Sequence, residues 1–340
     1  MSKATRIIAL TTCALAMAGS AAAQDKVTLR FADWMPLSHY TVSQAALPFI
    51  QKAKDQSGGK LEIQHFPAEQ LGKAKDALSL LQSGVADIAN ISPSYIADKF
   101  ALTSVAELPA MFDTACQGSK GVAALVEGNG IIAEREFKSN GVRVLSSIAY
   151  APYKVGTVSK KVSKVDDFRG LKLRTAGGAM DLTATALGAV SVRMPGPDIL
   201  PSMTRGTLDG ALFPLQSVRV FDLQTVLKHQ TTNVSLGSFV TVYAISDRAW
   251  NRLSEANRKI LAEAGIHAAK THCEYVDAEE PKAIESLAKD GVAPNPMDAD
   301  QLPLLEAKLA PVKASWAKSL DDRGRPGSET LKAFTAAVAK

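Results

Sequence analysis

A short apolar strand that ends at an arginine lies at the middle of the chain, and the patterns on either side are arranged around it. Its sequence is Gly170-Leu171-Lys172-Leu173-Arg174-Thr175-Ala176-Gly177-Gly178. Helical spacing of apolar residues over 181–187 predicts a helix directly after the two glycines. At the exit of a strand and before a helix N-terminus, an arginine offers a planar fork of donors where backbone N–H groups also converge. We therefore predict that Arg174 holds the carboxylate of a small ligand.

Alternating strand and helix patterns begin at the N-terminal side of the mature chain. Residues 27–31 alternate with the period of a strand, 41–57 have helical spacing, and 61–66 predict the next strand. A predicted helix over 73–83 then leads to a strand around 85–91. Strands that alternate with helices of these lengths predict an α/β fold with mostly parallel sheets covered by helices on both faces.

One sequence pattern occurs twice. Residues 83–89, Ser-Gly-Val-Ala-Asp-Ile-Ala, resemble residues 205–211, Arg-Gly-Thr-Leu-Asp-Gly-Ala. Each copy has a glycine that ends a helix and an aspartate that leads a strand, and each follows a strand, a proline-bearing loop and a helix. The repeat predicts two matched lobes that face each other. The alternative is chance recurrence of Gly-x-x-Asp at helix-to-strand turns.

The segment 142–158 is β-prone and about three times longer than the usual strand of ~5–6 residues. We predict that it crosses from one lobe to the other and that the chain returns near 239–245. Helical spacing over 254–287 predicts a long helix that braces both lobes, and the tail over 302–339 is also helical in pattern. The predicted boundaries are 24–151 with 240–279 for one lobe, and 152–239 with 280–340 for the other.

The first 23 residues have the features of a secretory signal peptide. Lys3 and Arg6 precede an apolar run over 7–19, and Ala21-Ala22-Ala23 follows it. The run is shorter than the roughly 20 residues that a membrane-spanning helix needs. We expect cleavage before Gln24 and a mature protein that works outside the cytoplasm.

Two cysteines, Cys116 and Cys273, remain after that cleavage. Outside the cytoplasm such a pair can form a disulfide. Sequence alone does not place the two residues within bridging distance, so a disulfide and two separate buried thiols both stay open.

Nucleic-acid binding and common enzyme chemistries find no support in the sequence. The formal net charge is +5, and the basic residues are spread along the chain, so no nucleic-acid-binding surface is expected. The motifs of serine hydrolases, P-loop proteins and dinucleotide-binding enzymes are absent. His267 and His272 share a predicted helix but project about 140° apart, which excludes a metal pair. No cofactor, metal or catalytic residue is predicted.

Five motifs occur in order along nearly the whole mature chain. They are Leu29-Arg30-Phe31-Ala32-Asp33-Trp34, Gln70-Leu71-Gly72, residues 81–89, residues 167–174, and Arg205-Gly206-Thr207-Leu208-Asp209-Gly210. In order and spacing they resemble the solute-binding proteins of tripartite ATP-independent periplasmic (TRAP) transporters, of the dicarboxylate-binding type. The resemblance implies a periplasmic protein with two α/β lobes, joined by crossing strands and a long bracing helix, that close on one ligand.

The resemblance also assigns roles in the cleft. In that family the arginine of the Gly-Leu-Lys-(Leu/Ile)-Arg motif is the main carboxylate anchor, which by position is Arg174. Where relatives often have a second arginine, an asparagine and a histidine, this chain has Lys154, Phe213 and Asn233. One arginine, one lysine and an added aromatic ring favour a monocarboxylate with an apolar or aromatic body. Lys154 could still serve a second carboxylate, and Phe213 could belong to the core.

The other wall of the cleft is expected from the first lobe. Loops at the carboxyl ends of parallel strands are where such sheets bind ligands. Trp34 either stacks on a ring of the ligand or packs under its own loop. The candidate residues are Trp34, Ser38, His39, Tyr40, Gln70, Asn90, Ser92 and Tyr95.

The predicted function is capture of a small organic acid and its delivery to the small and large membrane subunits of a TRAP transporter. We expect a monomer that binds no nucleic acid and performs no covalent chemistry. Two alternatives use the same scaffold. A secreted two-lobed enzyme acting on a carboxylic acid would need a nucleophile or base in the cleft, and a periplasmic ligand-sensing subunit would need no transporter.

Overall fold

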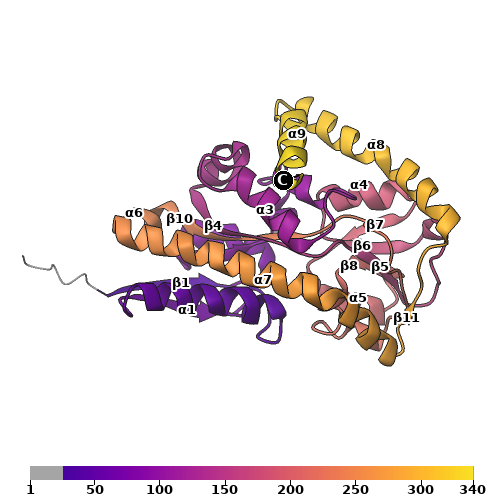
Figure 1. Ribbon diagram of the computed structural model, residues 1–340, viewed down its shortest axis with the longest axis horizontal. Coiled ribbons are helices and arrows are strands. Elements are labelled where there is room, and N and C mark those ends of the chain that lie inside the picture. Colours follow the sequence, from indigo (N-terminus) through magenta and orange to yellow (C-terminus); the bar gives the residue numbers. More distant parts are fainter. Residues whose placement is uncertain (1–25, 340) are drawn as a thin grey trace, which may run out of the picture.

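The computed structural model describes residues 26–339. The predicted signal peptide, residues 1–23, and its cleavage point before Gln24 lie outside the described residues. Within 26–339 the strands form two sheets that follow one another along the long axis of the molecule, and we call the parts built on them the first and the second lobe (Figure 1). No helix in this range is both long and apolar enough to cross a bilayer.

The two sheets have corresponding strand orders. The first consists, in spatial order, of β2 (Leu61–Phe66), β1 (Val27–Ala32), β3 (Ile88–Ile91), β10 (Val240–Ser246) and β4 (Val142–Ala149). The second consists of β7 (Val190–Arg193), β6 (Lys172–Thr175), β8 (Gly210–Phe213), β5 (Lys154–Thr157), β9 (His229–Gln230) and β11 (Ala293–Pro294). In each sheet the third strand in this order, β3 or β8, runs parallel to the two strands before it. The lobes therefore repeat one construction.

The repeated sequence pattern lies at equivalent places in that construction. Gly84 follows α2 (Ala77–Ser83) and precedes β3, while Gly206 follows α5 (Ile199–Thr204) and precedes β8. Both glycines have left-handed backbones, with φ of 80° and 72°. That conformation ends a helix and is strained for other residues. The shared glycine thus has a structural cause in both copies.

The sheets are mixed, whereas mostly parallel sheets were predicted. In each sheet the fourth strand has come from the other lobe and runs antiparallel to both neighbours. In the first sheet this strand is β10, between β3 and β4, and in the second it is β5, between β8 and β9. A strand that enters from the other lobe runs in the opposite direction to its new neighbours. The alternation of strand and helix patterns in the sequence does not predict this direction.

The predicted crossing strand over 142–158 is interrupted at residues 150–153, between β4 and β5. Pro152 lies in the gap, and its nitrogen has no hydrogen to donate to a strand ladder. The returning segment runs beside the gap, because the N–H of Tyr153 donates to the carbonyl of Gly237 at 2.8 Å. Backbone hydrogen bonds therefore join the two segments that connect the lobes.

Two sets of helices span both lobes (Figure 1). The long helix α7 (Glu255–Lys289) contacts α1 and β4 in the first lobe and β11 in the second, which confirms the predicted bracing helix. The helical tail is also confirmed, as α8 packs on α4 and α9 packs on α3. The other helices are α1 (Leu47–Gln56), α3 (Ala115–Val126), α4 (Ala179–Ala186), α6 (Asp247–Asn251), α8 (Leu302–Asp321) and α9 (Gly327–Val338).

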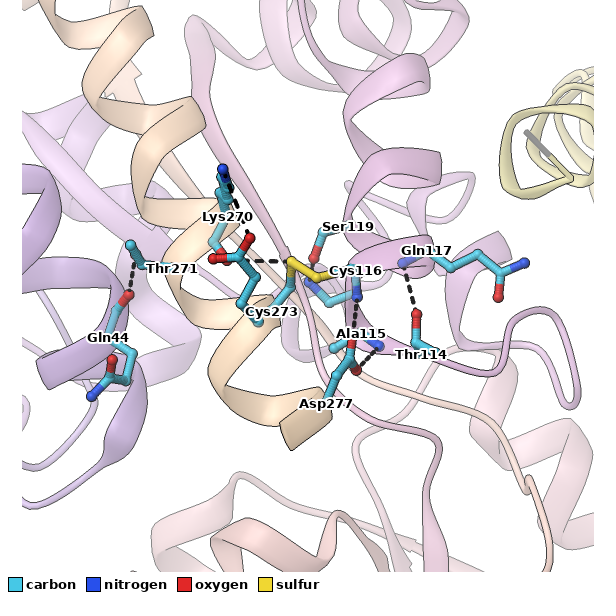
Figure 2. Close-up of a disulfide and its surroundings, with 12 residues drawn as sticks. Gln44, Thr114, Ala115, Cys116, Gln117, Ser119, Lys270, Thr271, Cys273 and Asp277 are labelled. Carbon is cyan, nitrogen blue, oxygen red and sulfur yellow. Dashed lines mark hydrogen bonds and ion pairs between the residues drawn. A yellow bond between two sulfur atoms is a disulfide. The ribbon is translucent and has the colours of Figure 1, made fainter. Parts of the chain in front are cut away.

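A disulfide fastens α3 to the middle of α7 (Figure 2). It joins Cys116 to Cys273, with 4.7 Å between the Cα atoms, which settles the alternative that the sequence left open. Beside it, the carboxylate of Asp277 accepts hydrogen bonds from the backbone N–H groups of Ala115 and Cys116, at 2.6 and 3.1 Å. These donors at the start of α3 have no partner within the helix. The disulfide and the Asp277 cap thus both link the start of α3 to α7.

A carboxyl group is buried where the lobes meet. Glu107 ends the 3-10 turn Thr103–Glu107 of the first lobe, and its carboxyl accepts a hydrogen bond from the hydroxyl of Ser94. Its other oxygen is so close to Gly178, just before α4, that a Cβ there would lie 3.3 Å away. Burial raises the pKa of Glu107 to about 8, although the hydrogen bonds and Arg174 act in the opposite direction. The group is therefore protonated at neutral pH.

Removal of the disulfide tests the role of this cross-link. We expect the double variant Cys116→Ala/Cys273→Ala to lose about 2–5 kcal/mol of unfolding free energy, because the bond closes a long loop of the unfolded chain. Urea unfolding measures this change. A reductant should lower the wild-type midpoint to that of the variant and leave the variant unchanged. Equal midpoints for the two proteins without reductant would contradict the prediction.

Substitution of Glu107 tests its buried, neutral state. In the unfolded chain the carboxyl loses its proton near its ordinary pKa of 4.5, whereas in the folded protein it keeps the proton up to about pH 8. Stability is therefore lost as pH rises through this window, and Glu107→Gln avoids a loss on the order of 4 kcal/mol at pH 8. Urea unfolding between pH 5 and pH 8 measures the difference, with the exposed Glu285→Gln as the matched control. A difference that does not grow with pH would refute this account.

Candidate ligand-binding site

A small cavity lies between the lobes, near the ends of β1, β3, β6 and β8. The space that remains open inside it is only about 10 Å³, far below the ~300–1,000 Å³ usual for small-molecule sites, so the cleft is nearly closed. Both lobes and both crossing segments contribute to its walls. The lining residues are Trp34, Met35, His39, Tyr95, Tyr150, Tyr153, Arg174, Gly196, Phe213, Pro214, Ser217, Phe221 and Phe239.

Arg174 is the permanently charged group of this lining. It is only 1% exposed, and its guanidinium donates to the carbonyl of Met194 at 2.9 Å, to the carbonyl of Leu212 at 3.3 Å and to the hydroxyl of Tyr95 at 3.3 Å. Each of these acceptors is neutral. No carboxylate among residues 26–339 forms an ion pair with Arg174. A buried charge without a counter-ion is costly, which points to a ligand that supplies one.

The two glycines after Arg174 allow the second lobe to come close to the first. Gly177 has φ of 102°, and a Cβ on it would lie 2.9 Å from the carbonyl oxygen of Ser94 in the first lobe. Gly178 has φ of 58° and faces Glu107, as described above. A side chain at either position would hold the lobes apart. The glycine pair therefore belongs to the closed cleft as much as to the start of α4.

Lys154, the second cation predicted for the site, is not among the lining residues. It lies opposite Phe213 in the pairing of β5 with β8 and is 7% exposed. Its ammonium group pairs with the carboxylate of Glu280 on α7 at 3.2 Å. The resemblance placed Lys154 by its position on a strand, which does not reveal a partner on a distant helix. The cavity is thus left with the single charge of Arg174.

Aromatic rings form most of the cavity wall. The guanidinium carbon of Arg174 lies 5.5 Å from the ring centre of Phe213, a distance typical of cation–π contact. Phe213 also packs in the core of the second lobe, so the cavity wall and the core share it. Trp34 is 5% exposed, lines the cavity, and packs edge-on against Tyr95 at 5.5 Å. Its indole N–H has no hydrogen-bond partner among residues 26–339.

Tyr95 connects the two lobes beside the anchor. Its hydroxyl accepts hydrogen bonds from the Arg174 guanidinium and, at 3.1 Å, from the backbone N–H of Gly196. Burial raises the pKa of Tyr95, so the phenol is neutral at physiological pH. Tyr95 therefore lines the cavity and contacts Arg174 directly.

A second polar contact between the lobes involves Ser217, which follows β8. Its Oγ lies 3.2 Å from Nε2 of His39 and 3.0 Å from the hydroxyl of Tyr40, both in the first lobe. The N–H of Thr41 donates to Nδ1 of His39 at 3.0 Å, so the ring proton is on Nε2. Burial, with a smaller effect of His272, lowers the pKa of His39 to about 3, and the ring is neutral.

Several residues predicted from the sequence do not line the cavity. Gln70 and Ser38 are exposed. Asn90 is buried, and its amide donates to the carboxylate of Asp33 at 2.9 Å. Asn233 forms two hydrogen bonds with the backbone of Met297, at 2.8 and 3.0 Å. Ser92 is buried just before the 3-10 turn Pro93–Ile96 that carries Tyr95, and its hydroxyl has no partner among residues 26–339.

The sequence reasoning missed several lining residues. Tyr150, Tyr153 and Phe239 lie in the two segments that cross between the lobes, and Ser217 and Phe221 follow β8. One signal was available for the first three, because aromatic residues gather in the segments predicted to cross. Nothing in the local pattern distinguishes Ser217 from other serines in turns.

The described chain also contains no group of three or more histidine, cysteine, aspartate or glutamate side chains placed to hold a metal ion. The site as built offers one fixed positive charge, neutral hydrogen-bond donors and apolar rings. Such an arrangement binds a small anion with an apolar body and orients it.

Several known proteins are similar to this chain in sequence and in fold. Residues 33–319 match the family model of the bacterial extracellular solute-binding proteins, family 7. The C4-dicarboxylate-binding periplasmic protein DctP of Rhodobacter capsulatus is 24% identical over 312 residues, 87% of each chain. A TRAP solute-binding protein from a marine metagenome, specific for aromatic acid ligands and crystallised with 3-hydroxybenzoate, has a TM-score of 0.86 at 23% identity, covering 93% of this chain and 98% of that one. A TRAP solute-binding protein of Bordetella bronchiseptica, with bound (R)- and (S)-mandelate, has a TM-score of 0.83 at 25% identity, covering 92% and 99%.

The family match covers most of the chain, from the loop after β1 to the last turns of α8. It includes Arg174, both crossing segments and every residue that lines the cavity. The solved TRAP proteins have the same two-lobed fold over more than nine-tenths of their length. The chain therefore belongs to the bacterial extracellular solute-binding proteins of family 7, the solute-binding proteins of TRAP transporters.

Proposed function

We propose that this protein captures a small monocarboxylate with an aromatic or apolar body and delivers it, as a monomer, to the membrane subunits of a TRAP transporter. The observation that carries the proposal is the guanidinium of Arg174, which is buried, without a carboxylate partner, and set against the ring of Phe213. A planar carboxylate satisfies the two remaining N–H directions of such a fork. The attached body then lies among the aromatic rings of the wall.

The charge balance of the site favours one carboxylate over two. Lys154 is paired with Glu280 outside the cavity, and the buried Glu107 is protonated at neutral pH. A second carboxylate on the ligand would be desolvated without a cation to meet it, which is costly in a closed cavity. The solved relatives with 3-hydroxybenzoate and mandelate also bind small aromatic monocarboxylates.

Capture follows from closure of the lobes. The ligand's carboxylate bonds to Arg174 in the second lobe, while its body contacts Trp34 and Tyr95 in the first, so it favours the closed arrangement over the open one. The contact of Tyr95 with Arg174 and Gly196 adds a direct lobe-to-lobe link. Delivery then requires only that the closed form docks on the transporter. No covalent step is proposed: the serine beside a histidine in the cavity is Ser217, and Nε2 of His39 carries a hydrogen and donates to it, so it is not placed to act as its base.

Substitution of the two cations tests the single anchor. We expect Arg174→Lys to weaken benzoate binding by about 2 kcal/mol or more, since a point charge cannot replace the fork. Lys154→Met is the matched control and should change the affinity less than about threefold, because Lys154 lies outside the cavity. Isothermal titration calorimetry measures both. Equal losses in the two variants would show that the carboxylate is not held by Arg174 alone.

The choice between one and two carboxylates is tested with the wild-type protein. We expect benzoate to bind at least ~100-fold more tightly than succinate, because the second carboxylate of succinate would be buried without a partner. Calorimetric competition in one buffer at pH 7 compares them directly. Tighter binding of succinate would overturn the proposed ligand class and leave the family assignment intact.

A further inference from the structure

We propose that Ser217 determines specificity within the same site, by donating a hydrogen bond to an oxygen atom carried on the body of the ligand. This inference rests on the proposed function, and it names the ligand more closely. The expected ligand is an oxygen-bearing aromatic or apolar monocarboxylate, such as a ring-hydroxylated acid, rather than a plain hydrocarbon acid.

Ser217 and Arg174 line the same cavity, and a series of aromatic contacts connects them. The guanidinium of Arg174 lies 5.5 Å from the ring of Phe213, which lies 5.7 Å from Phe221, which lies 5.6 Å from His39. His39 is in turn hydrogen-bonded to Ser217. In the proposed complex, a ligand held by its carboxylate at Arg174 contacts these rings and meets Ser217 with an atom of its body.

One of the hydrogen-bond donors around Ser217 has no acceptor among the described residues. His39 Nε2, the hydroxyl of Tyr40 and the hydroxyl of Ser217 provide three hydrogens, but they form only two mutual bonds, both at Ser217 Oγ. Neither hydroxyl has another hydrogen-bond partner among residues 26–339. Buried donors are rarely left without an acceptor, so the remaining hydrogen indicates a partner that the protein does not supply.

The remaining hydrogen points to the cavity through Ser217. Ser217 and His39 line the cavity, whereas Tyr40 does not. If Tyr40 donates to Ser217, the Ser217 oxygen accepts from both neighbours and its own hydrogen is free to meet a ligand. Ser217 is 1% exposed, so bulk solvent does not reach it. The acceptor is then an oxygen of the ligand.

The donor stays neutral and available across the physiological pH range. Burial lowers the pKa of His39 to about 3 and raises the pKa of Tyr40, so neither group ionises there. The neighbouring groups do not change this. The backbone N–H of Thr41 donates to Nδ1 of His39, and the other buried histidine, His272, is also neutral, because burial lowers its pKa to about 3. A neutral donor favours a hydroxyl or carbonyl oxygen, and it provides no cation for a second carboxylate.

Three ligands and three proteins test this assignment. The ligands are benzoate, 3-hydroxybenzoate and 4-hydroxybenzoate, and the proteins are wild type, Ser217→Ala and Tyr40→Phe. For the wild type, at least one hydroxybenzoate should bind about tenfold more tightly than benzoate, because a site built to bind a hydroxyl penalises the analogue that lacks it. In Ser217→Ala this ratio of affinities should fall to near one. Isothermal titration calorimetry provides each dissociation constant.

Tyr40→Phe is the matched control. Ser217→Ala removes two hydrogen bonds between the lobes and Tyr40→Phe removes one, so each variant should bind benzoate more weakly, but Tyr40→Phe keeps the Ser217 hydroxyl and should keep the ratio. A ratio that is unchanged in Ser217→Ala, or lost equally in both variants, would overturn the inference. A wild type that prefers neither hydroxybenzoate would do the same. If the wild type binds none of the three acids, the proposed function fails first and this inference fails with it.

Discussion

The buried guanidinium of Arg174 is the constraint on which the rest of the cleft depends. Its charge has no carboxylate partner among the described residues. Glu107 keeps its proton because of burial, and Glu280 is committed to Lys154. The closed state therefore has the free-energy cost of a buried charge without a counter-ion, and an anionic ligand would remove that cost. We propose that an anion binds here because the protein leaves its own cation unpaired.

The segments that connect the lobes also form part of the site. Tyr150, Tyr153 and Phe239 line the cavity from the crossing segments, and a backbone hydrogen bond joins Tyr153 to Gly237. Closure and ligand contact therefore involve the same stretch of chain, rather than a hinge at a distance from the cleft. Outside these segments, α7 contacts both lobes, α8 packs on α4, and α9 packs on α3 (Figure 1). The disulfide at Cys273 fastens α7 to α3.

Local pattern was sufficient to predict the two lobes and to single out Arg174, which the structure places in the lining of the cavity between them. Arg174 was predicted because a strand, two glycines and a helix follow one another in sequence, and the long helix α7 was predicted from apolar spacing alone. Contacts between distant segments were not predictable in this way. The partner of Lys154 is on α7, more than a hundred residues away, and the donors around Ser217 come from the other lobe. Each depends on how the lobes meet, which no single stretch of sequence contains.

The central claim is that one buried cation selects one carboxylate. Native mass spectrometry of the protein, purified without added ligand, tests it most directly, because a solute held in a closed cavity can survive purification and be identified by its mass and fragmentation. The account predicts a bound small monocarboxylate with an aromatic or apolar body and at least one further oxygen. A retained dicarboxylate, or a ligand without any carboxylate, would contradict it.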